Sequence, residues 1–440
     1  MKKVTIHVFL LLIDLVISIA IYFLGSPSLK AICTFAIVSL IIVWYSVLHT
    51  DGAKITYSSS LLLYTCATQF GLIIPYAFIG AGVIANYKEW TTSFVHSNCI
   101  SLAVLLGVIG VTSYELGVQF SRIKYAGIKN NTVGGSEYND QLNWEIRFYY
   151  AGTLLLSFVL LFFLFHIQTG GMRLFSTYEL FRQSKVYTSS IYSYILIIYY
   201  VGTIYLASAG KIVDHKIGWF IWLIIAVIFA ANGNKGEFMY ALLAVFGMKG
   251  TEGNKINRRT VLLVAGIIFI LIPSITSLRS IGIAGNLSQF KFDPIEAFTE
   301  MGMQLRTSVF MLDDLNSGEV HLLYGRSYIQ PIINILTPFM KHTQATAEIR
   351  KMYGGVGFNQ VIESFLNFKM IGVMGFFGIV GYVIGKYEAK ASSKEKLAYL
   401  GTVVCILINA TRNYFAFVPG QILIVTLIFF VIKRLSFSRR

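Results

Sequence analysis

The sequence predicts an all-helical protein that crosses a membrane many times. Of its 440 residues, 55% are hydrophobic and only 13% are charged, whereas soluble domains carry about 25% charged residues. The mean hydropathy is +0.67, and long apolar runs recur along the whole chain. A spanning segment must satisfy its backbone hydrogen bonds internally, and the many short alternating strands of a barrel are missing, so the spans are expected to be helices.

Apolar runs of this kind predict about twelve spans. They lie near residues 5–24, 31–48, 60–85, 99–119, 148–167, 190–209, 217–232, 236–248, 260–276, 371–385, 397–411 and 416–432. The first run is too long for the core of a signal peptide, so it is expected to remain as an uncleaved span. The runs at 217–232 and 236–248 are short, and they are interpreted either as two tilted spans or as one re-entrant pair.

Basic residues in the short loops predict the orientation, because cytoplasmic loops are enriched in lysine and arginine. With the N-terminus inside, the even-numbered loops and the C-terminal tail are basic; examples are Arg122, Lys124, Lys249, Lys386, Lys433 and Arg434. Both termini are therefore expected in the cytoplasm. These loops, together with an anionic lipid surface or ligand, explain the net charge of +15 better than nucleic acid does. Residues 1–440 are predicted to form a single membrane domain.

One large loop, residues 277–369, is expected on the outer side, and it differs from the other loops in length and polarity. Asp293-Pro294-Ile295-Glu296 has the pattern of a helix start, with an acceptor at the cap and proline at the first helical position. A second amphipathic segment, around residues 328–340, is interrupted by Pro331 and Pro338. Helices with apolar faces beside spans usually lie on the bilayer or cap a cavity.

The third loop segment, residues 354–368, combines a glycine-rich turn with about three helical turns. One helical face is apolar, and the other carries Asn359, Gln360, Glu363 and Asn367. Glu363 lies one turn from both asparagines. The segment is either an interfacial helix with a solvated side or a polar site centred on a carboxylate.

Cations on the outer side run against the usual orientation bias, so each requires a reason. They are Arg173, Lys235, Arg279, Arg306, Arg326 and Arg412. Guanidinium groups at the outer ends of spans suit phosphate, because the planar fork binds two oxygens and stays charged. Each could instead reach lipid headgroups or pair with a local acid. Beside a large outer loop, the set together favours a lipid-linked pyrophosphate.

Few residues are candidate bases or metal ligands, and Glu363 is the best placed. Asp313 and Asp314 point about 100° apart on a helix, so a solvated pair is favoured over a metal site. His321 and His342 are isolated, and the four cysteines sit in apolar segments at unrelated spacings. Asp14 and Glu115 lie inside spans and are expected to face the bundle, in a structural or a functional role. The first outer loop, residues 25–30, holds no Asp or Glu that could bind a metal ion. Chemistry without a metal or cofactor is therefore expected.

Short motifs then show a resemblance to a known family. They are Asn232-Gly233-Asn234-Lys235-Gly236, Leu323-Tyr324-Gly325-Arg326-Ser327-Tyr328 followed by Pro331, Gly354-Gly355-Val356-Gly357-Phe358 leading to Glu363, and Asn367-Phe368 with Gly372 and Gly375. With many spans, cytoplasmic ends and one large late outer loop, the chain resembles the Wzy-type O-antigen and oligosaccharide repeat-unit polymerases. The motifs cover the C-terminal half, and the layout covers the whole chain.

The resemblance implies a glycosyltransferase of the inner membrane with a GT-C-like membrane fold. Its substrates, donor and acceptor, would be oligosaccharides linked to undecaprenyl pyrophosphate and embedded in membrane lipid, and a chain-length regulator protein is an implied partner. The growing glycan would leave its pyrophosphate at the periplasmic face and join the non-reducing end of a new repeat unit. The first alternative is a lipid-linked oligosaccharide flippase, which would show paired halves with broken helices. The second is an O-antigen ligase.

The resemblance also implies roles for individual residues. Glu363 would be the base or would position the acceptor, and Arg279 and Arg412 would bind the pyrophosphate. Substrate contacts are expected from Arg306, Arg326, Lys235, Tyr324, Asn359, Asn367 and Arg173. Where the family commonly has arginine after the Gly-Asn break, this chain has Lys235, which keeps the charge but loses the bidentate fork.

Overall fold

A computed structural model gives the fold, and in the residues that it describes all regular structure is helical. The described residues are 2–25, 27–52, 54–85, 87, 89–125, 135–170, 181, 183–188, 190–210, 216–232, 234–253, 270, 273–275, 277, 296–337, 339, 340, 346, 349, 358–390 and 393–434. This part of the chain holds 7 helices long and apolar enough to cross a membrane, and a bent pair that would make 8. The predicted class, a helical multi-pass membrane protein, is confirmed.

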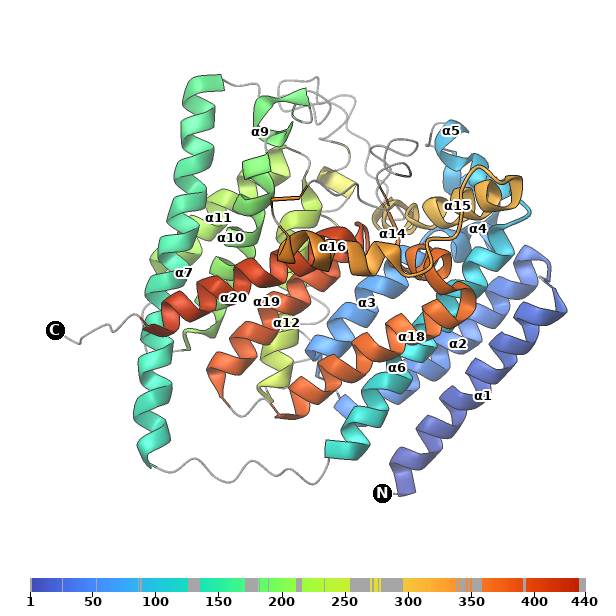
Figure 1. Cartoon of the computed structure of the whole chain (residues 1–440), viewed down its shortest axis with the longest axis horizontal. Helices are drawn as coiled ribbons and strands as arrows, with labels where there is room; N and C mark the ends of the chain where they lie inside the picture. The colour runs from blue at the N-terminus through green and yellow to red at the C-terminus, as the bar shows by residue number, and fades with distance from the viewer. Residues whose placement is uncertain are drawn as a thin grey trace. The chain divides into compact units, whose positions relative to one another are not determined.

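The longer helices coincide with predicted apolar runs, and shorter helices lie between them (Figure 1). In the first part of the chain they are α1 (Lys2–Leu24), α2 (Leu29–Asp51), α3 (Tyr57–Phe70), α4 (Ile73–Ile79), η1 (Ala81–Ile84), α5 (Glu89–Thr92), η2 (Ser93–His96), α6 (Ile100–Tyr125), α7 (Gly135–Gly170), α9 (Lys185–Thr188) and α10 (Ser190–Ser208). The remainder are α11 (Lys216–Ala231), α12 (Lys235–Thr251), α14 (Glu296–Gly302), α15 (Leu305–Ser317), α16 (Arg326–Leu336), α18 (Gln360–Lys390), α19 (Lys394–Ala410), η5 (Phe415–Phe417) and α20 (Val418–Arg434).

Three predicted runs have a more detailed structure than expected. The run at 60–85 is broken, because α3 and α4 meet at a bend of 41°. The short runs at 217–232 and 236–248 become two separate helices, α11 and α12, of 16 and 17 residues. At about 1.5 Å per residue, each is shorter than a bilayer core of about 30 Å. The run at 260–276 lies mostly outside the described residues.

The chain divides into two compact units. Unit 1 comprises Met1–Ile128, Phe298–Lys390 and Leu407–Ile422, and unit 2 comprises Lys129–Ala297, Ala391–Ile406 and Leu423–Arg440. Unit 1 contains the Glu363 segment and most of the described loop helices. The prediction of a single membrane domain stays a prediction.

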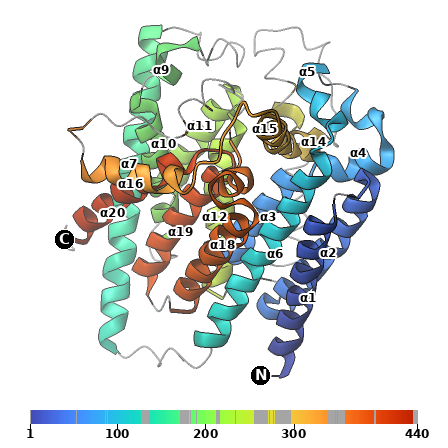
Figure 2. The same ribbon diagram turned by 45° about the vertical axis from the view of Figure 1, so that its right-hand side comes forward.

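Unit 1 is built around the helices α6 and α18, which pack along each other, with α1, α2 and α3 also against α6 (Figures 1 and 2). The α6–α18 contact is close because glycines line it. A Cβ atom added at Gly117 would collide with the carbonyl oxygen of Gly378, and one at Gly381 with that of Tyr114. Small residues at such positions let two membrane helices approach backbone to backbone.

Replacing Gly381 with alanine is therefore expected to destabilise unit 1. The added methyl group meets backbone atoms that cannot rotate away, and overpacking of this kind costs about 1–3 kcal/mol. Thermal unfolding of the purified protein in detergent should show a lower Tm. Gly375→Ala is the matched control on the same helix, because a Cβ atom there meets nothing within 4 Å; an equal fall in both variants would contradict this packing.

The helix α18 is broken at residues 368 and 369 into a short first helix and a long second one. Phe368 (φ −143°, ψ 29°) and Lys369 (φ 52°, ψ −145°) are not helical, and a positive φ is uncommon for a residue with a side chain. A Cβ atom at Gly372 would collide with the carbonyl oxygen of Ser364, so the sharp turn requires glycine there. The residues before the break form a short helix with Glu363 at its centre, and the apolar residues after it form the span.

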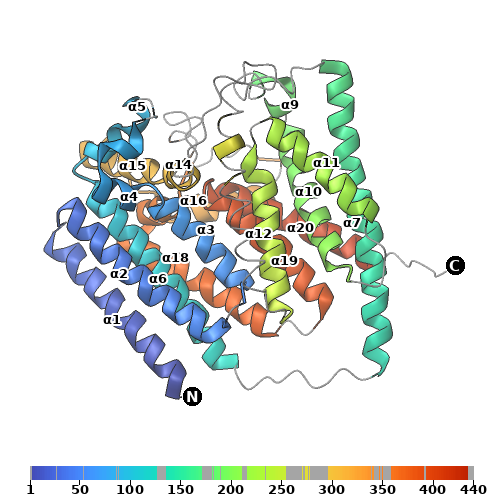
Figure 3. The same cartoon turned by 180° about the vertical axis from the view of Figure 1, so that it is seen from behind.

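Unit 2 is organised around α7 and α10, with α11 against α7 (Figure 3). Glycine again permits the close approach, since a Cβ atom at Gly152 would lie 2.7 Å from the backbone nitrogen of Leu206. In the first half of α7, Glu145 forms an ion pair with Lys394. The rings of Trp144 and Phe429 stack with their centroids 6.0 Å apart. Lys235 begins α12 in this unit.

Candidate functional site

Glu363 lies at the centre of a buried polar cluster in unit 1. Its exposed fraction is 0%. Carboxylate oxygen Oε2 accepts hydrogen bonds from the backbone nitrogen of Phe415 at 2.9 Å and from Nε2 of Gln360 at 3.3 Å. In the described part of the chain, no hydrogen bond of ordinary length reaches Oε1. Burial raises the pKa of Glu363 to about 7, and hydrogen bonding from the Phe415 backbone, Ser327 and Gln360 opposes that rise. A carboxylate has room for about four hydrogen bonds, so Glu363 retains unused capacity to accept one.

The polar side of the Glu363 helix is not solvated, because the three other polar residues on it are buried as well. Oδ1 of Asn359 accepts from Nε2 of Gln69 at 3.0 Å and caps the helix by accepting from the nitrogen of Val361 at 2.9 Å. One turn beyond Glu363, Nδ2 of Asn367 donates to Oγ of Ser327 at 2.7 Å. The interpretation as an interfacial helix with a solvated side is therefore wrong.

Arg412 lies beside this cluster, just after the end of α19. Its carbonyl oxygen accepts from the nitrogen of Phe358 at 3.0 Å, which fixes it to the start of the Glu363 helix. With the Gln304 amide oriented so that its oxygen faces Arg412, that oxygen accepts from Nε at 3.1 Å and Nη2 at 3.0 Å. The backbone oxygen of Gln304 in turn accepts from Nδ2 of Asn359 at 3.5 Å. Gln304 thus connects Arg412 with Asn359.

Arg306 is the second guanidinium of this region, and it lies two residues after Gln304. Its side chain is half-buried, and its Nε is buried with no hydrogen-bond partner among the described residues. Burial, and then the positive charge of nearby Arg412, lower the pKa of Arg306 from its usual value. The two positive charges repel each other, and both side chains are partly removed from water. An anion bound beside them would relieve this repulsion.

An apolar pocket adjoins the cluster. Both hydrogen-bond donors to Glu363, Gln360 and Phe415, line it. The remaining lining residues are Leu61, Thr65, Tyr114, Phe376, Phe377, Val380, Leu407, Ala410, Thr411 and Val418. Gln360 also donates to the carbonyl oxygen of Asn413 at 2.7 Å. The carboxylate is therefore held by residues that themselves face a pocket, although it does not line the pocket.

The structure brings together five of the predicted site residues, namely Asn359, Glu363, Asn367, Arg306 and Arg412. Arg326 and Tyr324 are exposed on the surface and lie outside the buried cluster. Lys235 is in the other unit. Arg279 and Arg173 lie outside the described residues.

Sequence reasoning missed the residues that complete the cluster. Gln69, Gln304 and Ser327 come from three different segments, and only the fold brings them to the Glu363 helix. Gln360 could have been identified from the sequence, because it precedes Glu363 by one helical turn on the predicted polar face.

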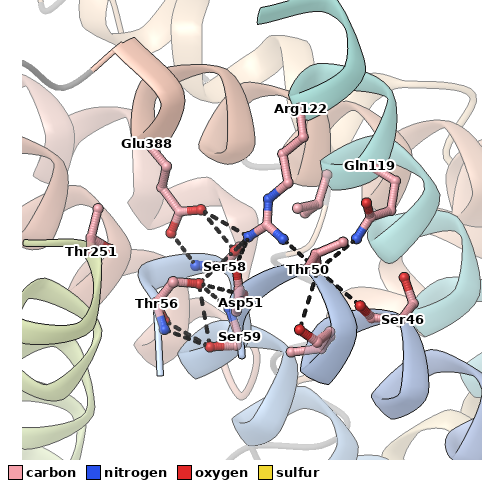
Figure 4. Close-up of polar contacts among 12 residues, drawn as sticks. Ser46, Thr50, Asp51, Thr56, Ser58, Ser59, Gln119, Arg122, Thr251 and Glu388 are labelled. Atoms are coloured by element: carbon pink, nitrogen blue, oxygen red, sulfur yellow. Dashed lines mark hydrogen bonds and ion pairs between the residues drawn. The ribbon is translucent and has the colours of Figure 1, made fainter. Parts of the chain in front are cut away.

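A second polar cluster lies at the opposite end of α18 (Figure 4). Arg122 pairs with Asp51 at 2.7 Å and with Glu388 at 3.6 Å. Glu388, whose side chain is 7% exposed, also accepts from the nitrogen and hydroxyl of Ser58 at 2.6 and 2.8 Å. The cluster joins α2, α3, α6 and α18, and its charges satisfy one another, which is typical of a structural network. In the sequence, Arg122 indicated only a basic loop.

The two carboxylates predicted to face the bundle do so. Asp14 accepts from the hydroxyls of Ser39 and Thr112, each at 2.7 Å. Glu115 accepts from Ser46 at 2.9 Å and from Gln119 at 2.6 Å. Within the described residues, no group of three or more His, Cys, Asp and Glu side chains could hold a metal ion. His321 is exposed, and His342 lies outside the described residues.

Comparison with known proteins assigns the family. No solved structure matches this chain. Protein CapE of Staphylococcus aureus is 25% identical to it over 376 residues, which cover 82% of this chain and 81% of that protein. The family model described as O-antigen polysaccharide polymerase Wzy matches residues 4–439. The chain therefore belongs to the Wzy family of O-antigen polysaccharide polymerases, as its motifs indicated.

Proposed function

We propose that the protein joins oligosaccharide repeat units carried on undecaprenyl pyrophosphate, at the outer face of the cytoplasmic membrane. A hydroxyl at the non-reducing end of the acceptor unit attacks the anomeric carbon of the growing glycan. The new glycosidic bond forms as the bond from that carbon to the pyrophosphate breaks. The pyrophosphate leaves with the electron pair, and the hydroxyl proton passes to a base.

The observation that carries this proposal is the pair of arginines, Arg306 and Arg412, near the buried polar cluster that contains Glu363. A departing pyrophosphate gains negative charge, and fixed guanidinium groups stabilise that charge as it develops. Arg306 forms no ion pair with the described residues, and the Nε of its guanidinium is buried without a hydrogen-bond partner. An anion placed between these arginines would supply that partner. Arg279 is proposed as a third cation for the same group.

Glu363 is proposed as the base or as the residue that positions the acceptor. No hydrogen bond of ordinary length reaches its Oε1 in the described part of the chain, and the attacking hydroxyl would supply one. Asn359 and Asn367 hold the helix that carries Glu363 and would contact sugar when the cluster opens. Surface contacts to the glycan are proposed for Tyr324 and Arg326, and further contacts for Lys235 and Arg173.

For the membrane arrangement, about twelve spans in a GT-C-like fold are proposed, with both termini in the cytoplasm and the large loop outside. The lysines and arginines of the short loops support this orientation. The transfer would need no metal, since the arginines provide the charge that a metal ion would otherwise supply. Membrane lipid surrounds the spans, and a chain-length regulator protein is a proposed partner.

A strain lacking the gene separates this proposal from its alternatives. The polymerase proposal expects single repeat units to reach the outer face and to stay unextended. Accumulation of lipid-linked units on the cytoplasmic face would indicate a flippase instead. Polymer of normal length that is not attached to its lipid core would indicate a ligase.

A further inference from the structure

The helix α16 exposes apolar side chains and buries polar or small ones, which is the reverse of a helix on a water-soluble surface. Ile329 and Leu336 are 57% and 75% exposed, and Ile332 and Ile333 are exposed beside them. At 100° per residue these four side chains fall within one arc of about 100°. The opposite side carries Ser327 and Pro331, which are buried. The adjacent loop helix α15 does the opposite and buries Leu305, Val309 and Leu312.

The exposed arc, together with Phe339 and Met340, is continuous with the exposed surface of the span in α18. Gly325, at the start of α16, lies against the ring of Phe368, where an added Cβ atom would be 2.7 Å from the ring. After Phe368 the exposed apolar surface continues along α18 with Ile371, Ile379 and Val383. Ile371 is 73% exposed. Exposed apolar side chains along a span face lipid, so the arc of α16 extends a lipid-facing surface.

The direction and charge of the helix agree with a place in the surface of a bilayer. Figures 1 and 2 show α16 lying across the direction of α18 rather than along it. Arg326 and Lys369 are both exposed at the edge of the apolar surface, and neither forms an ion pair with the described residues. Tyr324 is exposed beside them. Tyrosine and basic side chains around an apolar helix are typical of the level of lipid headgroups.

The buried side of α16 is hydrogen-bonded to the Glu363 helix. The hydroxyl of Ser327 accepts from Nδ2 of Asn367 at 2.7 Å, and the hydroxyls of Tyr328 and Ser364 are 2.8 Å apart. The nitrogen of Leu323, just before α16, donates to the carbonyl oxygen of Leu366 at 2.8 Å. A change in the position of α16 would therefore act directly on residues 364–367.

We propose that α16 lies in the surface of the bilayer, with its apolar arc among the acyl chains of phospholipids, and that this contact holds the Glu363 helix in place. Through this contact, the surrounding lipid would affect the position of the polar residues around Glu363. The proposal requires only that unit 1 spans a membrane, and it does not depend on which sugars are joined.

Spin-label accessibility tests the lipid contact on the full chain in vesicles of phosphatidylethanolamine and phosphatidylglycerol. Cysteine is placed at Ile333, Leu336 or Asn334, and a nitroxide label reports collisions with oxygen, which enters lipid, and with a nickel chelate, which stays in water. Ile379 on α18 serves as the lipid reference and Glu319 as the water reference. The four native cysteines are buried, so the unsubstituted protein measures the background labelling.

The labels at Ile333 and Leu336 are expected to favour oxygen as the Ile379 label does, and the Asn334 label is expected to favour it less. Preference for nickel at the arc would overturn the proposal, because water would then cover it. Low accessibility to both reagents would also overturn it, because protein would then cover the arc; loss of that protection on dilution with lipid would identify a second copy.

A pair of charge substitutions tests the link to the Glu363 helix. The double variant Ile332→Glu, Leu336→Glu is expected to abolish the oxygen preference of a label at Ile333 and to speed hydrogen exchange of the amides in residues 360–367. Gln330→Glu adds one charge to the same helix outside the arc, with a side chain of the same shape that can still hydrogen-bond to Asn334, and is expected to change neither. Faster exchange in both variants, or in neither, would overturn the proposed coupling.

Discussion

Replacing Glu363 with glutamine is expected to stop chain extension while the protein stays folded in the membrane. Glutamine has the same shape, and its carbonyl oxygen can still accept the hydrogen bond from the Phe415 nitrogen. The variant cannot take a proton or carry a negative charge beside the acceptor hydroxyl. General-base catalysis contributes about 10²–10⁴-fold to a rate, so a loss of at least about 10²-fold is expected.

Gel analysis of the surface polysaccharide measures this effect, with the amount of protein in the membrane determined in the same cells. The variant should give a band for a single repeat unit in place of the ladder. Glu319→Gln is the control, because Glu319 is exposed and lies outside the cluster. A normal ladder from Glu363→Gln would remove Glu363 from the role proposed for it.

Replacing Arg412 with lysine is expected to have the second largest effect. Lysine retains the positive charge but lacks the planar fork, which in the native protein gives two hydrogen bonds to Gln304. If Arg412 stabilises the departing pyrophosphate, kcat should fall by about 10²-fold, the size seen when one donor is removed from such a site. KM should change little, because the charge develops only during bond breaking.

A double variant of Arg306 and Arg412 tests more sharply whether the two arginines bind the same anion. Arg306→Lys and Arg412→Lys act on one anion in the proposal, so their effects in the double variant should not add. Lys390→Gln, an exposed substitution at the other end of α18, serves as the control. Fully additive losses, or a rise in KM with unchanged kcat for Arg412→Lys, would contradict a shared role in stabilising the leaving group.

The sequence predicted several of the membrane helices because apolar length is a local property. The runs that became α1, α2, α6 and α7 could be read directly. The short helix around Glu363 was also predicted, and so was its end before the run at 371–385. Local patterns carry this information because a helix closes its hydrogen bonds within about four residues.

Burial of the Glu363 helix could not be predicted, because distant segments cover it. Gln69 reaches Asn359 across 290 positions of the chain. From the sequence alone, a polar helical face has the same pattern whether it meets water or other polar side chains. The closeness of Arg306 to the charge of Arg412 depends in the same way on the fold.

The cluster of Arg122, Asp51 and Glu388 shows the same limit at the other end of the bundle. Ser58 and Glu388, which hydrogen-bond to each other, are 330 positions apart. Charge counting places Arg122 in a basic loop, but the pairing requires that the ends of α2, α6 and α18 meet the start of α3. For α16 the pattern was identified correctly as amphipathic, but only the structure shows that its apolar side is the exposed one.

Reconstitution tests the central claim most directly. The purified chain in vesicles is given repeat units linked to undecaprenyl pyrophosphate, with a metal chelator present, and both the glycan and the released lipid are measured. The expected result is a ladder of polymer with one undecaprenyl pyrophosphate released for each unit joined, and neither product from Glu363→Gln. Loss of both products under chelation would contradict metal-free transfer, and movement of intact units across the bilayer without a new bond would contradict polymerisation itself.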